Sequence, residues 1–268
     1  MEQPIQRIHP APESARPLTG TYLGTPLEPE RSGDRLFVYA NFVRSLDGRI
    51  SVREADGVET VPGDVANPRD WRLFQELAAR ADVLLSSGRY FRDLSAGHAQ
   101  DILPLGTGTA FDDLRDWRRA RGLPPQPDVA VLSASLDFVV PPSLFEQGRR
   151  VTVLTTDAAD RARADQLRAA GAEVTAVSQG TRVRGRDAAS ALYSAGYRRA
   201  YSATGPWVLH AFVADDRLDA LFITTVHRLI GGHDYASVLE GPRLNPASDW
   251  HLHWLYHDPH GPGPGGQQ

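Results

Sequence analysis

From residue 37 to residue 50 the chain reads Phe37-Val38-Tyr39-Ala40-Asn41-Phe42-Val43-Arg44-Ser45-Leu46-Asp47-Gly48-Arg49-Ile50. The first half is a near-continuous apolar run, which is typical of a strand buried on both faces of a parallel sheet. The second half turns polar at Ser45, Asp47 and Gly48, just beyond the carboxyl end of the predicted strand. Open α/β sheets bind ligands at that edge. The stretch therefore indicates either a ligand site or an ordinary Asp-Gly turn.

The composition of the chain narrows the class of protein. Of 268 residues, 41% are hydrophobic, which is enough for a sizeable core. A formal net charge of -4 and a pI near 6.1 argue against nucleic acid as the main partner. Without cysteine the chain has no disulfide framework and no thiolate metal site. It also lacks a membrane-spanning apolar run and a signal-peptide pattern, so we expect a cytoplasmic protein with no membrane partner.

Strands and helices alternate along the rest of the chain. We expect strands at residues 82–86, 128–133, 150–156, 173–177 and 199–203, and helices at residues 111–122, 158–170 and 186–195. A further helix begins at Pro68 behind an Asn67 cap, and Asp157 is the expected cap of the helix at 158–170. Such alternation predicts an α/β fold with a mostly parallel central sheet flanked by helices.

A second polar stretch, Ser87-Gly88-Arg89, follows the strand predicted at residues 82–86. Glycine lets backbone amides approach a phosphate, and arginine supplies a rigid fork of donors. Ser133, Thr155 and Thr204 would line the same edge of the sheet. Hydroxyls at strand ends bind ligands in some proteins but more often cap neighbouring backbone, so both interpretations stay open for each of them.

The stretch from Ala40 to Ile50 resembles the opening strand of the riboflavin-biosynthesis reductase domain, the RibD C-terminal family, whose fold is similar to dihydrofolate reductase. Two later stretches, Ser87 to Asp93 and Tyr201 to Leu209, continue the resemblance in the family's order, so that it covers roughly Leu36 to Trp254. The chain departs from the family where Ala203 and Thr204 replace the acid and the first glycine of a Glu-Gly-Gly-Pro motif. This replacement leaves the exact substrate open.

The resemblance implies an NADPH-dependent reductase that reduces the ribosyl group of a ribosylamino-pyrimidine phosphate to ribityl. It also implies a homodimer and antiparallel C-terminal strands. Asp47 would be catalytic, and Asn41, Ser45 and Arg49 would contact the substrate. The residues expected to bind NADPH are Ala40, Ser87, Gly88, Arg89, Ser133, Thr155, Thr204, Gly205, Pro206 and Trp207. The alternatives are a reductase of another small, for example pterin-like, substrate and a non-catalytic nucleotide-binding protein.

The two ends of the chain are expected to lie outside a reductase domain at residues 35–258. Residues 1–34 are rich in proline and predict an extended arm, and residues 259–268 predict a disordered tail. Between them, alternation from Trp250 to His257 predicts a closing strand. His251, His253 and His257 share one face of it, but no carboxylate or cysteine joins them at a characteristic spacing, so no metal site is expected.

Overall fold

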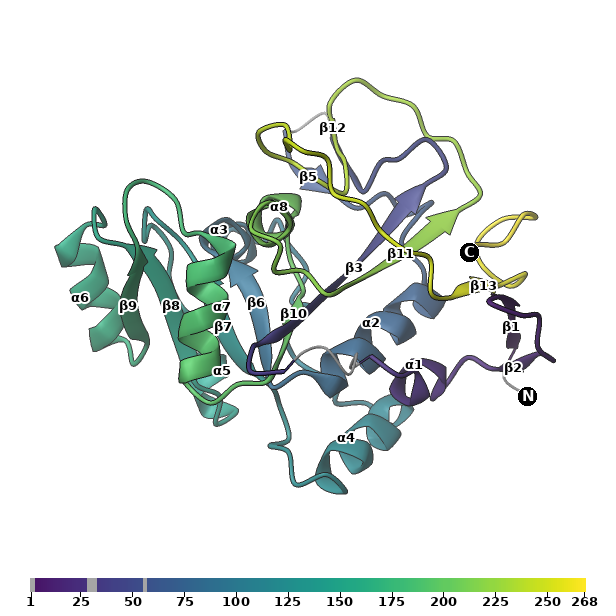
Figure 1. Ribbon diagram of the computed structural model, residues 1–268, viewed down its shortest axis with the longest axis horizontal. Helices are drawn as coiled ribbons and strands as arrows, with labels where there is room; N and C mark the ends of the chain where they lie inside the picture. Colours follow the sequence, from purple (N-terminus) through teal and green to yellow (C-terminus); the bar gives the residue numbers. More distant parts are fainter. Residues whose placement is uncertain (1–2, 28–32, 55–56) are drawn as a thin grey trace.

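A computed structural model describes residues 3–27, 33–54 and 57–268 of the chain. At its centre lies a seven-stranded parallel sheet with the strand order β11-β3-β10-β6-β7-β8-β9 (Figure 1). These strands are β3 (Phe37–Ser45), β6 (Val83–Ser87), β7 (Asp128–Leu132), β8 (Val151–Thr156), β9 (Glu173–Ser178), β10 (Arg199–Ser202) and β11 (Ala220–Val226). The predicted α/β fold with a mostly parallel sheet is confirmed.

The opening apolar stretch forms β3, an interior strand that pairs in parallel with β10 and β11. Its side chains alternate between two buried faces. Phe37 and Tyr39 pack into one core cluster, whereas Val38 and Ala40 pack into the other. Tyr39 also stacks on Tyr201 of β10, with ring centroids 5.1 Å apart. Burial on both faces is the reason why this strand reads as continuous apolar sequence.

Helices contribute buried residues to both of these clusters. On the face that carries Tyr39 they include α2 (Pro68–Arg80), α3 (Gly88–Ser95), α4 (Asp112–Arg119), α5 (Pro142–Glu146) and α6 (Arg161–Ala169). On the other face they are α7 (Gly185–Ser194) and α8 (Pro206–Ala214). A short 3-10 turn, η1 (Thr109–Phe111), precedes α4.

Helix starts show where local sequence decides structure. Asn67 caps α2 as predicted, because its side chain accepts hydrogen bonds from the amides of Arg69 and Asp70 at 3.1 and 2.9 Å. The predicted cap of α6 is wrong. Asp160, not Asp157, caps that helix, and Asp157 instead accepts a hydrogen bond from the amide of Gly180 at 2.9 Å. Asp157, which the local pattern assigns to the helix as its cap, is therefore used in a tertiary contact with Gly180.

The packing of α7 on α8 depends on a glycine. A Cβ atom at Gly185 would lie 2.3 Å from the carbonyl oxygen of Ala211, so only glycine permits this approach of the two helices. The contact fixes the position of α8 relative to the segment that leads into α7. Both of these segments reach the carboxyl edge of the sheet.

The N-terminal segment packs on the body of the protein and is not the extended arm that the prolines predict. β1 (Pro4–His9) pairs antiparallel with β2 (Arg16–Pro17) and with β13 (Leu255–His257), and α1 (Thr21–Gly24) lies against α2. The buried carboxylate of Glu76 in α2 accepts hydrogen bonds from the amides of Gly20, Tyr22 and Leu23. A carboxylate from elsewhere in the chain therefore organises this segment.

The C-terminal part also differs from expectation. Of the predicted closing strand, only β13 forms, and it pairs with β1 outside the main sheet. Trp250 and Leu252 are exposed. The predicted disorder at residues 259–268 is wrong, because Gln267 is buried and exchanges backbone hydrogen bonds with Asp258, while Gln268 does so with Thr225. Backbone hydrogen bonds hold this end of the chain in place. Such bonds do not require apolar side chains, so the sequence shows no pattern that would predict them.

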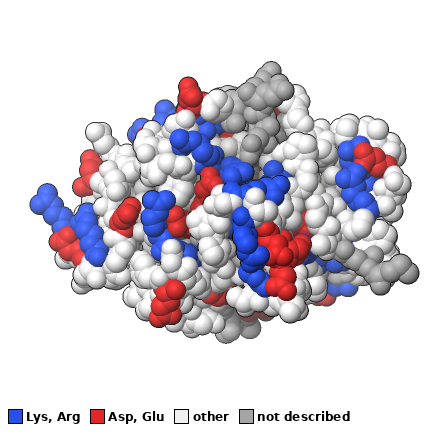
Figure 2. Space-filling view, turned by 90° about the horizontal axis from the view of Figure 1, so that it is seen from below, with Lys and Arg blue, Asp and Glu red and all other residues white. Residues whose placement is uncertain are grey.

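A second small sheet, in addition to the one formed by β13, β1 and β2, has the order β12-β4-β5; it is antiparallel and consists of β4 (Ser51–Arg53), β5 (Glu59–Thr60) and β12 (Tyr235–Ala236). With β13 it supplies the predicted antiparallel C-terminal strands. On the face shown in Figure 2, basic and acidic side chains are interspersed. In the part of the chain that the structure describes, no helix is long and apolar enough to cross a membrane.

Candidate functional site

A hollow of about 560 Å³ lies at the carboxyl edge of the sheet, between α8 and the segment that joins β9 to α7. Three of the predicted cofactor-binding residues line it, namely Ser87 after β6, Ser133 after β7 and Trp207 of α8. These residues are far apart in the sequence, and the parallel sheet brings them to one edge. A volume of this size suits a small-molecule ligand.

Two arginines that sequence reasoning missed also line the hollow. Arg182 and Arg184 come from the segment between β9 and α7. The guanidinium of Arg182 lies 5.4 Å from the ring centroid of Trp207. Asp215, a carboxylate in the lining, forms its ion pair with Arg186 at 2.8 Å. The lining therefore carries more positive than negative charge. The only sequence signal was a cluster of arginines after a strand, which has no characteristic spacing.

The N-terminus of α8 opens toward this edge. Gly205 precedes the helix with φ 70° and ψ 131°, a backbone conformation that residues other than glycine rarely adopt. Pro206 occupies the first helical turn, and no side chain caps the helix. Thr204 is buried and donates a 3.4 Å hydrogen bond to Ser86. Pro206 has no amide hydrogen and the amide of Leu209 donates to the carbonyl of Gly205, so the amides of Trp207 and Val208 are the ones left for an external acceptor, as in anion sites at helix N-termini.

Gly88 owes its identity to packing. A Cβ atom at this position would lie 2.7 Å from Oγ of Ser133, so the glycine lets α3 start against the end of β7. Ser87 caps α3 by accepting a hydrogen bond from the amide of Tyr90 at 3.2 Å. Ser133 accepts one from the amide of Leu136 at 3.1 Å. Both hydroxyls serve as caps, but each can still donate its proton to a ligand.

Arg89 is already engaged by carboxylates. Its guanidinium pairs with Glu59 of β5 at 2.6 Å and with Asp93 of α3 at 3.5 Å, and its side chain is 53% exposed. It does not belong to the lining of the hollow. A phosphate that binds Arg89 must therefore compete with two carboxylates.

Two further predicted cofactor-binding residues lie in the interior. Ala40 is fully buried in the core cluster that α7 and α8 cover. Thr155 is buried at the end of β8, and its hydroxyl has no hydrogen-bond partner among the described residues. The hydroxyl of Ser202 at the end of β10 is also buried without a hydrogen-bond partner among the described residues. Two unpaired hydroxyls at strand ends add to the polar character of this edge.

The turn after β3 forms a compact polar cluster. Asp47 accepts hydrogen bonds from the hydroxyl of Ser45 at 2.5 Å and from the amides of Ile230 and Gly231 at 3.2 and 2.9 Å. It also pairs with Arg49 at 2.7 Å. These groups lower the pKa of Asp47 from 3.8 to about 2, with the Ser45 hydrogen bond as the largest cause. Asp47 is therefore a carboxylate near neutral pH.

Two of the three predicted substrate residues, Ser45 and Arg49, thus lie in this cluster with Asp47. Arg49 also donates to the carbonyl of Gly232 at 2.9 Å and lies 4.3 Å from the ring centroid of Tyr235. Ser45 is buried and accepts a hydrogen bond from the amide of Arg49 at 3.0 Å. Asn41 lies further back along β3, where it accepts a hydrogen bond from the hydroxyl of Tyr201.

A second carboxyl group, which the sequence did not single out, lies buried near β11. Burial raises the pKa of Asp70 in α2 from 3.8 to about 6, against the lowering effect of a hydrogen bond from Thr224. One of its oxygens has no hydrogen-bond partner among the described residues. The residues that the structure describes contain no group of three or more His, Asp or Glu side chains placed to hold a metal ion.

Comparison with known proteins gives one family. A family model described as the RibD C-terminal domain matches residues 36–254. The structure of a pyrimidine reductase-like protein from Corynebacterium diphtheriae is 18% identical with a TM-score of 0.59, over 80% of this chain and 83% of that one. RibD from Acinetobacter baumannii is 14% identical with a TM-score of 0.54, over 82% of this chain but only 52% of its own. At these identities the likeness shows the fold. No curated protein matches the chain.

Proposed function

The chain belongs to the RibD C-terminal domain family, and from this premise we propose that it is an NADPH-dependent reductase. Its substrate would be a ribosylamino-pyrimidine phosphate, whose ribosyl group it reduces to ribityl. The observation that carries the proposal is the hollow beside α8, where Arg182 and Arg184 face the helix that starts without a side-chain cap. We place the reaction in the cytoplasm and in a homodimer, in keeping with the family resemblance.

The residues of the hollow fit a dinucleotide that carries phosphates. We assign the pyrophosphate to the amides of Trp207 and Val208 at the start of α8; a Cβ at Gly205 would project into open space, which the glycine leaves free for the ligand. Arg182 and Arg184 would pair with the extra phosphate of NADPH, and the half-exposed ring of Trp207 would pack against a flat part of the cofactor. Arg89 would join them only by leaving Glu59.

When bound, NADPH supplies a hydride to the sugar carbon that is reduced. The chain must hold that carbon and exclude water. We assign this task to the cluster around Asp47. Because its pKa is about 2, Asp47 would act as a permanent negative charge that fixes the loop and the substrate, and not as a proton donor. Ser45 and Arg49, which Asp47 orients, and Asn41 would supply contacts to the substrate.

One position favours a second candidate, a reductase of a different small substrate on the same fold. Ala203 stands where the resemblance expects an acid, directly before the start of α8. A substrate that pairs with that acid in other members would lose its partner here. The two candidates share the cofactor site and differ only in the substrate accepted.

The test is a calorimetric titration of the full chain with NADPH and, in parallel, NADH. Replacement of both arginines, Arg182→Ala with Arg184→Ala, should weaken NADPH binding about tenfold or more, because charge-assisted hydrogen bonds contribute about 1.5–3 kcal/mol. NADH binding should change little. The matched control is Arg161→Ala, an exposed arginine on α6. Wild-type protein that binds neither cofactor would refute the proposal.

A further inference from the structure

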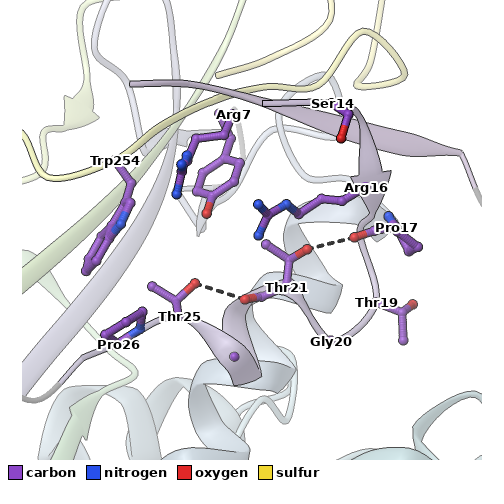
Figure 3. Close-up of a pocket in the computed structure, with 12 residues that line it drawn as sticks. Arg7, Ser14, Arg16, Pro17, Thr19, Gly20, Thr21, Thr25, Pro26 and Trp254 are labelled. Carbon is purple, nitrogen blue, oxygen red and sulfur yellow. Dashed lines mark hydrogen bonds between the residues drawn. The ribbon is translucent and has the colours of Figure 1, made fainter. Parts of the chain in front are cut away.

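A second hollow, of about 540 Å³, lies between the N-terminal elements β1, β2 and α1 and the C-terminal segment at Trp254 and Tyr256 (Figure 3). Its lining shares no residue with the hollow beside α8. Residues of β1 and β2 form one wall, α1 and its flanks form the floor, and Trp254 and Tyr256 close one side. β1, β2 and α1 lie before residue 36, where the family match begins, and Trp254 is the last matched residue, so most of the lining lies outside the matched domain.

The charge of this hollow is positive. Among the residues that the structure describes, Arg7 and Arg16 line it, and no aspartate or glutamate does. Both guanidinium groups pair with the single carboxylate of Glu13, which leaves one positive charge in excess within the group. The side chains of Arg7 and Arg16 are 21% and 38% exposed, so they are partly shielded and still reachable. Partial shielding strengthens a charge-assisted contact with an incoming anion.

The rest of the lining suits a ring and hydroxyl groups. In Figure 3, Trp254 lies at one side of the hollow and Arg16 at the other, with Arg7 between them, and a flat ring could stack on the indole. The hydroxyls of Thr21 and Thr25 donate to backbone carbonyls, at 2.7 and 2.9 Å. Their oxygens remain acceptors for hydroxyl groups of a ligand. Anion, hydroxyl groups and flat ring are the three parts of a nucleoside monophosphate.

We propose that this hollow is a second ligand site, which binds a nucleoside monophosphate with its phosphate at Arg7 and Arg16 and its base against Trp254. The volume admits a ligand of that size. The site does not depend on the proposed reductase activity, because its walls come from other elements. It gives the N-terminal segment a binding role that the family domain alone lacks.

The experiment titrates the full chain with AMP and with UMP, following tryptophan fluorescence and calorimetry at physiological salt. Arg16→Ala should weaken binding of the preferred nucleotide about tenfold, and Trp254→Leu about fivefold or more, through lost pairing and lost stacking. Arg161→Ala, on the distant α6, should leave binding unchanged, whereas Arg182→Ala serves only to report nucleotide bound in the other hollow. Arg16→Lys, which keeps the charge, should fall between wild type and Arg16→Ala and guards against a folding defect.

Adenosine and inorganic phosphate, each alone, separate the two parts of the ligand. The proposal expects both to bind more weakly than AMP. It is overturned if neither nucleotide binds, or if inorganic phosphate binds as tightly as AMP. Nucleotide binding that survives both Arg16→Ala and Trp254→Leu but is lost in Arg182→Ala would also overturn it, since that pattern assigns the nucleotide to the hollow beside α8. Failure of NADPH binding, in contrast, would leave these results intact.

Discussion

Replacement of Asp47 by asparagine tests whether this residue works as a fixed negative charge. The side chain keeps its shape and one acceptor, but it loses the ion pair with Arg49 and faces the amides of Ile230 and Gly231 with one acceptor fewer. In the native protein the pKa of Asp47 is about 2, below the ordinary value of 3.8. Folding therefore favours the ionised form, and the charge stabilises the folded state.

The size of this stabilisation follows from the lowered pKa. The full difference corresponds to about 2.5 kcal/mol, and solvent screening of a partly exposed carboxylate reduces it to about 1 kcal/mol. A carboxyl group whose pKa is lowered by folding stabilises the protein above its unfolded pKa, near 3.8, and the effect disappears as the pH falls toward 2. The deficit of Asp47→Asn should thus shrink by about 1 kcal/mol between pH 6 and pH 2.

Urea unfolding at a series of pH values measures this deficit directly. Asp249→Asn, an exposed aspartate with the same change of charge, is the matched control and should show no such trend. For activity, we expect kcat of Asp47→Asn to fall about 100-fold with NADPH affinity unchanged, because the substrate would be misplaced without the fixed charge. If the stability deficit of Asp47→Asn does not vary with pH, Asp47 does not stabilise the fold as a negative charge. Turnover equal to wild type would reduce Asp47 to a turn residue.

Three further predictions concern other sites. Burial raises the pKa of Asp70 from 3.8 to about 6, so the wild-type protein loses stability as the pH rises through this range. The free energy of unfolding of Asp70→Asn, relative to wild type, should therefore increase by up to about 3 kcal/mol from pH 4 to pH 7. Urea unfolding that shows no increase would contradict a buried charge at Asp70. Glu59→Gln should strengthen NADPH binding measured by calorimetry, because it releases Arg89, whereas an unchanged affinity would exclude Arg89 from the cofactor site. Gly205→Ala should lower the melting temperature without ligand by about 2–6 °C, because its φ of 70° strains any other residue; an unchanged melt contradicts this.

The sequence predicted the elements that carry a repeating pattern. β3 was predictable because burial on both faces makes the strand apolar throughout, and α2 because Asn67 caps it locally. The N-terminal segment was not, since its buried residues, Ile5, Leu18 and Tyr22 among them, follow no period. Its order depends on a carboxylate of α2, and no local pattern reports such a contact.

The candidate site divides in the same way. The polar turn after β3 is visible in the sequence, but the partners of Asp47 at Ile230 and Gly231 lie more than 180 residues away. Arg182 and Arg184 reach the hollow only because α7 packs closely on α8. Arg89 was the expected phosphate ligand from its place beside Gly88, whereas the structure pairs it with Glu59. That assignment stays a prediction.

The central claim is that this chain reduces a phosphorylated pyrimidine with NADPH. Its most direct test mixes the full chain with NADPH and the ribosylamino-pyrimidine phosphate, follows the absorbance of the reduced nicotinamide, and identifies the pyrimidine product by mass. The account predicts that NADPH is consumed only when the pyrimidine is present, and that the product gains two hydrogens per NADPH oxidised. Protein that binds NADPH but leaves it unoxidised with this pyrimidine and with pterins would contradict the claim.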